Sequence, residues 1–180
     1  MFNLLDSHDV PRLHNNENIR KSDYEMAVII MFMLPGTVSI YYGDEVELSG
    51  KTELIEYCRN PMDWNWQQRK EAVERFHFYQ KLISLKRKAS ALQNGGFRII
   101  HEEGYIFSCA RFTDKELVIA IVSMDDESGD ILFSLEDFGF DNRTFEKDYL
   151  GHPVVSKMTK ERVLIHVPAH TGYLLYIKNN

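Results

Sequence analysis

The apolar residues near the start of the chain fall into three short runs, and each run predicts one element of secondary structure. Residues 2–6 are mostly apolar and give way to polar side chains, as at the end of a buried strand. Residues 23–34 are apolar on almost every face, begin within the capping-box sequence SDYE and stop before Pro35, which predicts a buried helix. Residues 37–42, TVSIYY, lie between two glycines and predict a second buried strand. This order is a βαβ unit, which belongs to a parallel sheet.

A long loop and a long helix are expected next. Residues 43–66 contain the segments GDEVELSGK and CRNPMDWNW. A loop of this length is usually functional or disordered, and its aromatic and Met content argues against disorder. Residues 67–91 have apolar positions every 3.6 residues, which predicts an amphipathic helix. Its basic segment KLISLKRK suits the negative end of a helix dipole better than it suits a nucleic-acid surface.

The pattern changes near residue 95, where we place a domain boundary between residues 1–94 and 95–180. From Phe97 onward the sequence has short runs separated by turn-forming residues: FRII, YIFSCARF, ELVIAIVSM, DILFSL, RVLIHV and GYLLYI. Strands at this spacing predict an antiparallel β-sandwich. The fold class is therefore α/β followed by all-β. One βαβ unit and one helix are too few for a two-faced sheet, which indicates a piece of a larger α/β domain.

Composition and charge narrow the classes of partner. The chain has 180 residues, is 44% hydrophobic and carries a net charge of −6. This acidic balance argues against nucleic acid or an anionic membrane as the main partner, because both attract clustered basic side chains. The longest apolar run, residues 27–34, is too short to span a bilayer, and no signal peptide is recognisable. We therefore expect a cytoplasmic protein.

The cysteines and histidines predict no metal site. Cys58 and Cys109 are the only cysteines, and two separate thiols are favoured over a disulfide. No CxxC sequence and no closely spaced His and Cys set has the spacing of zinc ligands. His152, His166 and His170 are interpreted as ordinary surface or strand residues.

Candidate chemistry lies at the end of the first predicted strand. Asp6, Ser7, His8 and Asp9 follow one another there. Side chains at this end of a parallel strand face the loops in which α/β enzymes build their sites. An Asp in that place stabilises positive charge, acts as a base or binds metal, and a His donates to a substrate hydroxyl. A polar loop that only caps the strand explains the residues equally well. Ser7, His8 and Asp9 are not expected to form a catalytic triad, since neighbours on a strand point to opposite faces.

Four segments in order resemble the alpha-amylase family of glycoside hydrolases, family 13. FNLLDSHDVPR resembles the fourth signature region of the family, and MFMLPGTVSIYYGDEVELSG its seventh helix and eighth strand. CRNPMDWN is similar to the loop after that strand, and YQKLISLKRKASAL to the eighth helix. NLLDSHD most resembles the neopullulanase, cyclomaltodextrinase and maltogenic amylase group. The resemblance implies the last quarter of a (β/α)8 barrel (the end of strand 7, helix 7, strand 8 and helix 8) and a C-terminal β-sandwich.

The resemblance also implies roles for individual residues. Asp9 matches the third acid of the family, which stabilises the transition state. His8 matches a histidine that hydrogen-bonds the sugar before the scissile bond, and Arg59 matches a loop arginine near the same subsite. A structural role is favoured at several further positions: Tyr42, Asp44, Glu45, Met62 and Trp64. The implied substrates are α-glucans, maltooligosaccharides or cyclodextrins, cleaved with retention and without a metal or organic cofactor.

Two of the three acids of the family are absent from this sequence. The nucleophilic Asp and the proton-donating Glu of the family lie on earlier barrel strands, in G-x-R-x-D and E-x-x-D contexts. The 180 residues contain no G-x-R-x-D, and their one E-x-x-D, residues 127–130, lies in a predicted turn of the sandwich and not on a barrel strand. We therefore expect the isolated chain to be inactive. The alternatives are one half of a split enzyme completed by an N-terminal partner, a carbohydrate-binding or structural module, and an inactive relative that acts in assembly. An isolated quarter barrel should expose residues 2–6 and 26–42 and self-associate.

Aromatic side chains at alternating positions of the predicted sandwich have two interpretations. They are a sugar-stacking platform or part of the core, and their alternation favours the core. The residues concerned are Tyr105, Phe107, Phe112, Tyr173 and Tyr176.

Overall fold

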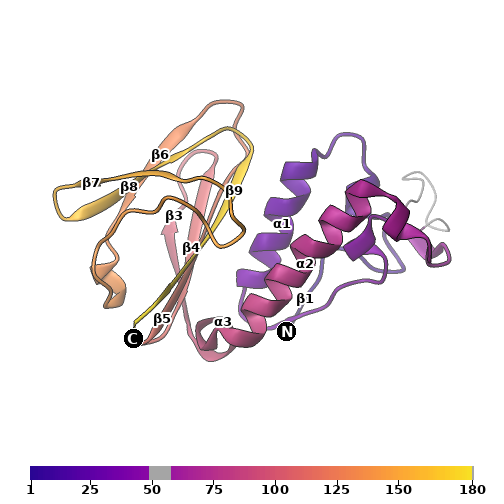
Figure 1. The fold of residues 1–180 in the computed structure, drawn as a ribbon, viewed down its shortest axis with the longest axis horizontal. Coiled ribbons are helices and arrows are strands. Elements are labelled where there is room, and N and C mark those ends of the chain that lie inside the picture. Colours follow the sequence, from indigo (N-terminus) through magenta and orange to yellow (C-terminus); the bar gives the residue numbers. More distant parts are fainter. Residues whose placement is uncertain (49–57, 180) are drawn as a thin grey trace. The chain divides into compact units, whose positions relative to one another are not determined.

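The computed structural model describes residues 1–48 and 58–179, which form two compact units, Met1–Leu85 and Lys86–Asn180 (Figure 1). In the first unit, β1 (Phe2–Asn3) pairs in parallel with β2 (Thr37–Val38), and Phe2 lies opposite Thr37. The helix α1 (Lys21–Met33) connects the two strands. The expected βαβ order is therefore present.

Short 3-10 turns and a second long helix complete the first unit. The turn η1 (Leu13–Asn15) precedes α1, and η2 (Asp44–Val46) follows β2. The turn η4 (Trp66–Gln68) leads into α2 (Lys70–Lys88). Of the predicted loop over residues 43–66, the part from 49 to 57 lies outside the described residues.

The two strands are shorter and more exposed than the sequence predicts. The predicted buried strands over residues 2–6 and 37–42 each shrink to two paired residues. Phe2 is 73% exposed and Leu4 is 48% exposed. The reason is that β1 and β2 pair only with each other among the described residues, so no further strand extends their ladder or covers their outer edges.

The helix α1 differs from its prediction in its cap and in its burial. The backbone N–H of Arg20 donates to the carboxylate of Asp23 at 3.3 Å, so the predicted box of Ser22 and Glu25 is wrong. The expected exposure of residues 26–42 is also wrong along the helix, where most apolar side chains are at most 4% exposed. After α1, Gly36 turns the chain with φ +119°, and a Cβ there would lie 2.8 Å from the carbonyl oxygen of Met1.

The predicted helix over residues 67–91 is divided. The helix α2 ends at Lys88, Ala89 has an extended backbone, and α3 (Ser90–Asn94) follows. The basic residues 86–88 occupy the last turn of α2, as expected from the helix dipole. The break arises because the Glu116 carboxylate accepts the backbone N–H of Ser90 at 2.6 Å and thereby caps a new helix.

The second unit is an antiparallel sandwich. Four strands form one sheet in the order β3-β4-β5-β9, namely β3 (Gly96–His101), β4 (Ile106–Phe112), β5 (Glu116–Ser123) and β9 (Thr171–Lys178). Three strands form the other sheet in the order β6-β8-β7, namely β6 (Gly129–Phe133), β8 (Arg162–Val167) and β7 (Val155–Thr159). One apolar core contains residues of both sheets, including Ile119 and Ile165. The predicted fold class, a barrel end followed by a sandwich, is confirmed.

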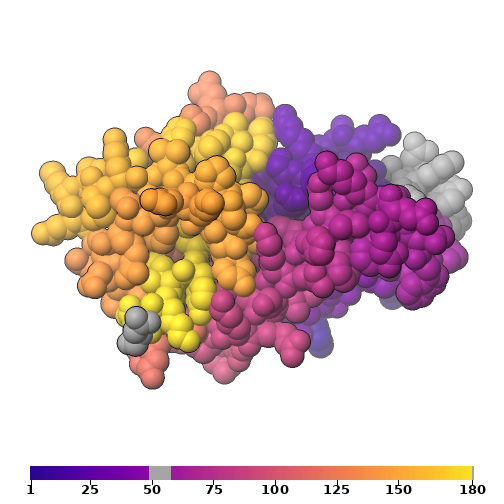
Figure 2. Space-filling model, in the orientation of Figure 1, coloured from indigo at the N-terminus to yellow at the C-terminus, as the bar shows by residue number. Residues whose placement is uncertain are grey.

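Segments of the second unit that are distant in sequence lie side by side on its surface, as the orange and yellow atoms in Figure 2 show. The backbone N–H of Tyr149 donates to the carbonyl of Leu174 at 2.7 Å, which ties the segment before β7 to β9. Every predicted run of this unit is a strand. The strand β7 is not predicted from the sequence, because its residues VSKMT are polar or largely exposed and carry no continuous apolar pattern.

Candidate active site at the end of the parallel strands

The loop after β1 brings His8 and Asp9 into contact. These residues lie in a turn rather than in a strand, and the two side chains approach to 3.1 Å between Nε2 of His8 and Oδ2 of Asp9. The argument from opposite strand faces therefore fails here. The backbone N–H of Asp9 donates to the Ser7 hydroxyl at 3.1 Å. The Asp9 side chain is 66% exposed, so its carboxylate is open to a ligand.

Arg59 reaches the same loop from a distant part of the sequence. Its Nη2 donates to Oδ1 of Asp9 at 3.2 Å, and its Nε donates to the carbonyl oxygen of His8 at 2.9 Å. The thiol of Cys58 donates to the same carbonyl at 3.1 Å. The structure therefore brings together all three residues that the sequence singled out for catalysis and substrate binding, Asp9, His8 and Arg59.

A buried ion pair anchors the far end of this loop. Nη1 of Arg12 donates to Oδ1 of Asp44 at 2.6 Å, and the two side chains are 0% and 4% exposed. Nη2 of Arg12 donates to the carbonyl of Cys58 at 3.2 Å, and its guanidinium lies 4.5 Å from the ring centre of Tyr41. Arg12 thus connects the loop after β1 to two later segments. One directly follows β2 and contains Tyr41 and Asp44, and the other contains Cys58.

The sequence analysis assigned no role to Arg12. Its only local signal is its place at the end of FNLLDSHDVPR, because its partner Asp44 lies 32 residues further along the chain. Burial raises the pKa of the Asp44 carboxyl, and the charge of nearby Asp6 raises it further, while Arg12 opposes the rise. Asp44 is therefore held in the interior by its partner and is not exposed at the candidate active site.

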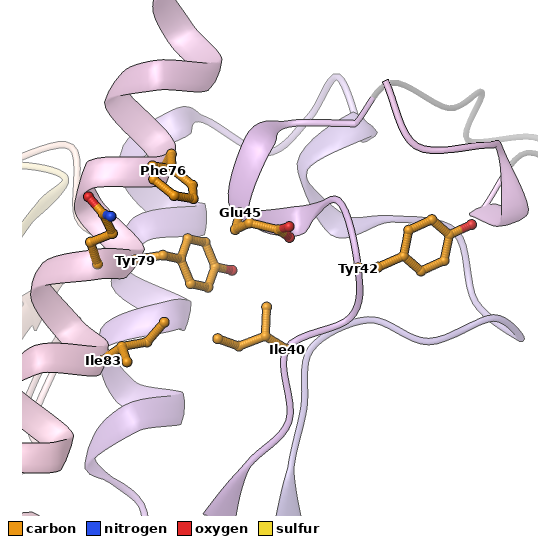
Figure 3. A pocket seen from close by; sticks show the side chains of 7 residues that line it. Ile40, Tyr42, Glu45, Phe76, Tyr79 and Ile83 are labelled. Carbon is orange, nitrogen blue, oxygen red and sulfur yellow. The ribbon is translucent and has the colours of Figure 1, made fainter. Parts of the chain in front are cut away.

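A separate hollow of about 330 Å³ lies in the first unit between α2 and the segment after β2 (Figure 3). Phe76, Tyr79 and Ile83 of α2 point toward Ile40 and Glu45 across it. None of the three candidate site residues lines this hollow. Its apolar walls distinguish it from the polar cluster around Asp9.

Exposed aromatic side chains depart from two expectations. Trp64 is 78% exposed, so its expected role in packing is wrong, whereas Trp66 packs on Phe76 with ring centres 4.7 Å apart. In the sandwich, Tyr173 is 3% exposed and belongs to the core, as expected. Tyr105 is 69% exposed and does not.

The thiols of the chain are separate, as expected. Cys58 and Cys109 are both buried and form no disulfide. No helix in the described part of the chain has the length and apolar character needed to cross a membrane.

Comparison with known proteins decides the family. The family described as "Alpha amylase, catalytic domain" matches residues 1–75. A cyclomaltodextrinase from a Bacillus species is 37% identical over 127 residues, which are 69% of this chain and 22% of that enzyme. The chain belongs to the alpha-amylase family. Neopullulanase 2 of Thermoactinomyces vulgaris is 28% identical over 141 residues, 77% of this chain and 23% of that enzyme.

Solved structures of alpha-amylase relatives share the fold. A cyclomaltodextrinase structure superposes with a TM-score of 0.73 and 26% identity over 97% of this chain and 29% of its own. A debranching enzyme from Nostoc punctiforme, soaked with acarbose, superposes with a TM-score of 0.74 and 25% identity over 97% of this chain and 33% of its own. The chain spans less than a quarter of the length of the two curated relatives above.

Proposed function

We propose that the chain is the C-terminal portion of an alpha-amylase-type enzyme that hydrolyses α-glucosidic bonds with retention. The observation that carries this proposal is the exposed cluster of Asp9, His8 and Arg59 at the end of the parallel strands. The proposal includes a division of the chain into a barrel part, residues 1–94, and a sandwich, residues 95–180. Its substrates are α-glucans, maltooligosaccharides or cyclodextrins.

In this proposal the three residues support the reaction rather than start it. A retaining hydrolase needs a nucleophilic carboxylate and a proton donor about 5–5.5 Å apart. The transition state resembles an oxocarbenium ion and is stabilised by a further ionised carboxylate, the role given to Asp9. Arg59 and His8 both contact the Asp9 side chain, and a sugar hydroxyl is the proposed partner of His8.

The isolated chain is proposed to be inactive, with the earlier barrel strands as its partner. The nucleophile context of the family does not occur in the 180 residues, and the one match to the proton-donor context, residues 127–130, lies in the sandwich. Exposed Phe2 and Leu4 and the apolar hollow beside Ile40 are surfaces on which the rest of a barrel would pack. The proposal also places the protein in the cytoplasm, since two buried thiols outside any disulfide suit a reducing compartment.

The test is activity with and without the missing strands. The purified chain is assayed on maltotriose and β-cyclodextrin, alone and after refolding with the preceding barrel segment of a cyclomaltodextrinase. The expected result is no turnover by the chain alone and turnover by the assembled enzyme. Asp9→Asn should lower kcat of the assembled enzyme at least 100-fold, because an ionised carboxylate near the transition state is lost. Asp114→Asn, an exposed residue of the sandwich, is the matched control.

Turnover by the chain alone that Asp9→Asn abolishes would contradict the proposed inactivity. An assembled enzyme that retains full activity with Asp9→Asn would contradict the role of Asp9.

Carbohydrate binding without catalysis is the second candidate function. The exposed rings of Trp64 and Tyr105 favour it, because sugars stack on exposed aromatic side chains. Affinity electrophoresis of the chain in gels that contain soluble starch separates the candidates. Retardation that Trp64→Ala or Tyr105→Ala removes, with no activity gained on assembly, would favour a binding module.

A further inference from the structure

Three side chains of the first unit that can bind a metal lie close together. Asp6, His14 and Asp44 each offer one ligand atom, and these atoms all lie within 4.8 Å of one another. They come from three segments: the loop after β1, the turn η1 and the turn η2. Asp6 and Asp44 are both 3% exposed, so the cluster is interior and not an acidic patch of the surface.

Two acceptor atoms of this cluster lack a hydrogen-bond donor. Oδ2 of Asp6 and Nδ1 of His14 are buried and have no hydrogen-bond partner among the described residues. A buried acceptor without a partner costs about 1–3 kcal/mol, and more if it is charged. Asp6 and His14 both belong to this cluster, so a cation bound there would satisfy buried acceptors that lack a donor.

The opposite polar atom of each side chain is already held in place. The backbone N–H of Leu13 donates to Oδ1 of Asp6 at 2.9 Å, and Nη1 of Arg12 donates to Oδ1 of Asp44 at 2.6 Å. The carbonyl of Leu48 lies 3.1 Å from Nε2 of His14, which must therefore carry the proton. Metal-bound histidines and carboxylates are typically oriented by such outer hydrogen bonds.

The charges of the cluster also leave room for a cation. Among the described residues, two carboxyl groups face the guanidinium of Arg12, while the neighbouring Arg75 pairs with Glu47. Burial raises the pKa of Asp44, and a bound cation would favour its ionised form. Because Nε2 of His14 faces the carbonyl of Leu48 and donates to it, Nδ1 of the neutral imidazole keeps a lone pair for an ion.

We propose that Asp6, His14 and Asp44 bind one divalent transition metal ion, with Zn²⁺ the best fit to one imidazole and two carboxylates. Zinc–ligand distances are about 2.0–2.2 Å and the geometry is tetrahedral, which puts ligand atoms about 3.5 Å apart, so the side chains move closer together on binding. Asp6 precedes the His8–Asp9 turn and His14 follows it. The ion therefore clamps both ends of the candidate site loop to the segment after β2. This site does not depend on the proposed hydrolase function.

The test is metal binding by the purified chain after treatment with a chelator. Isothermal titration with ZnCl₂ at pH 7.5 should show one saturable equivalent, and the same addition should raise Tm. His14→Gln should weaken zinc binding at least 100-fold and Asp6→Asn at least tenfold. His166→Gln, which removes an exposed histidine 2.9 Å from Asp130, should leave the affinity unchanged. Circular dichroism checks that each variant folds.

Cobalt supplies a readout that needs no variant. Co²⁺ added to the wild-type chain should give visible d–d bands of a site with oxygen and nitrogen ligands, without thiolate charge transfer from Cys58 or Cys109. No saturable binding, equal affinity in His14→Gln, or loss of binding in His166→Gln would each overturn the proposal. An Asp6→Asn variant with a raised Tm and no response of the wild type to zinc would show that the two carboxylates share a proton instead.

Discussion

At the scale of single residues, burial separates the two ion pairs around the candidate site. The pair of Arg59 and Asp9 is more than half exposed on both sides, so water screens it and leaves the Asp9 carboxylate available. The side chains of Arg12 and Asp44 are buried, and a charge in the protein interior is stable only when an opposite charge pairs with it. The exposed pair is accessible to a ligand, and the buried pair holds the loop that carries Asp9.

Arg12→Met is expected to destabilise the chain strongly, because it leaves the Asp44 carboxyl buried without its cation. The expected loss in the free energy of unfolding is about 3–5 kcal/mol. Lys21→Met removes an exposed partner of Glu74 and should cost less than about 1 kcal/mol. Urea denaturation followed by circular dichroism measures the free energy of unfolding of both variants. Equal losses in Arg12→Met and Lys21→Met would contradict the claim that the buried ion pair matters more for stability than the exposed one.

At the scale of elements, local pattern predicted the type of each helix and strand better than its length. The strands β1 and β2 are shorter than predicted because no further described strand pairs with them. The helix predicted over residues 67–91 is divided at Ala89. Glu116 on β5 causes that division, since it accepts hydrogen bonds from Ser90 and from the hydroxyl of Tyr176 at 2.9 Å. A strand residue thereby decides where a helix begins.

Glu116 is expected to make stability depend on acid pH. Burial works to raise the pKa of its carboxyl, but hydrogen bonds from Ser90, Tyr176 and Ala91 outweigh burial and lower the pKa to about 2. This contribution is fully present above the unfolded pKa near 4.5 and is lost as pH falls through 2. The contribution of this pKa shift to the free energy of unfolding is about 3 kcal/mol.

Thermal melts of the wild type and Glu116→Gln between pH 2 and 6 measure this effect. Tm of the wild type should fall more steeply below pH 4.5 than Tm of the variant. Glu102→Gln, on an exposed turn, should follow the wild type. Parallel curves of Tm against pH for Glu116→Gln and the wild type would show that the ionised Glu116 carboxylate is not the cause of the acid sensitivity.

At the scale of the whole molecule, the first unit carries apolar surface that a complete barrel would cover. Phe2 and Leu4 are exposed, and the two paired strands have free outer edges among the described residues. Such edges and side chains invite pairing with another chain. The second unit closes its own core between its two sheets and needs no such partner.

The isolated chain is therefore expected to self-associate. Light scattering after size exclusion should give a mass above the 21.1 kDa of one chain at micromolar concentration. Replacing both Phe2 and Leu4 by Lys should shift the mass toward that of the monomer, while Met158→Lys, on exposed β7, should not. A monomeric wild type at 100 µM would contradict this expectation.

The sequence by itself determined the order of the elements, the sandwich and the family, because these depend on local periodicity and on contiguous motifs such as NLLDSHD. Its motifs also singled out Asp9, His8 and Arg59. The tertiary structure alone decided which residues meet: Arg59 and Asp9 are 50 positions apart, and Arg12 and Asp44 are 32 apart. No local pattern encodes such pairs. It also decided that Asp6 and His14 share a buried cluster, since burial depends on everything that packs around a side chain.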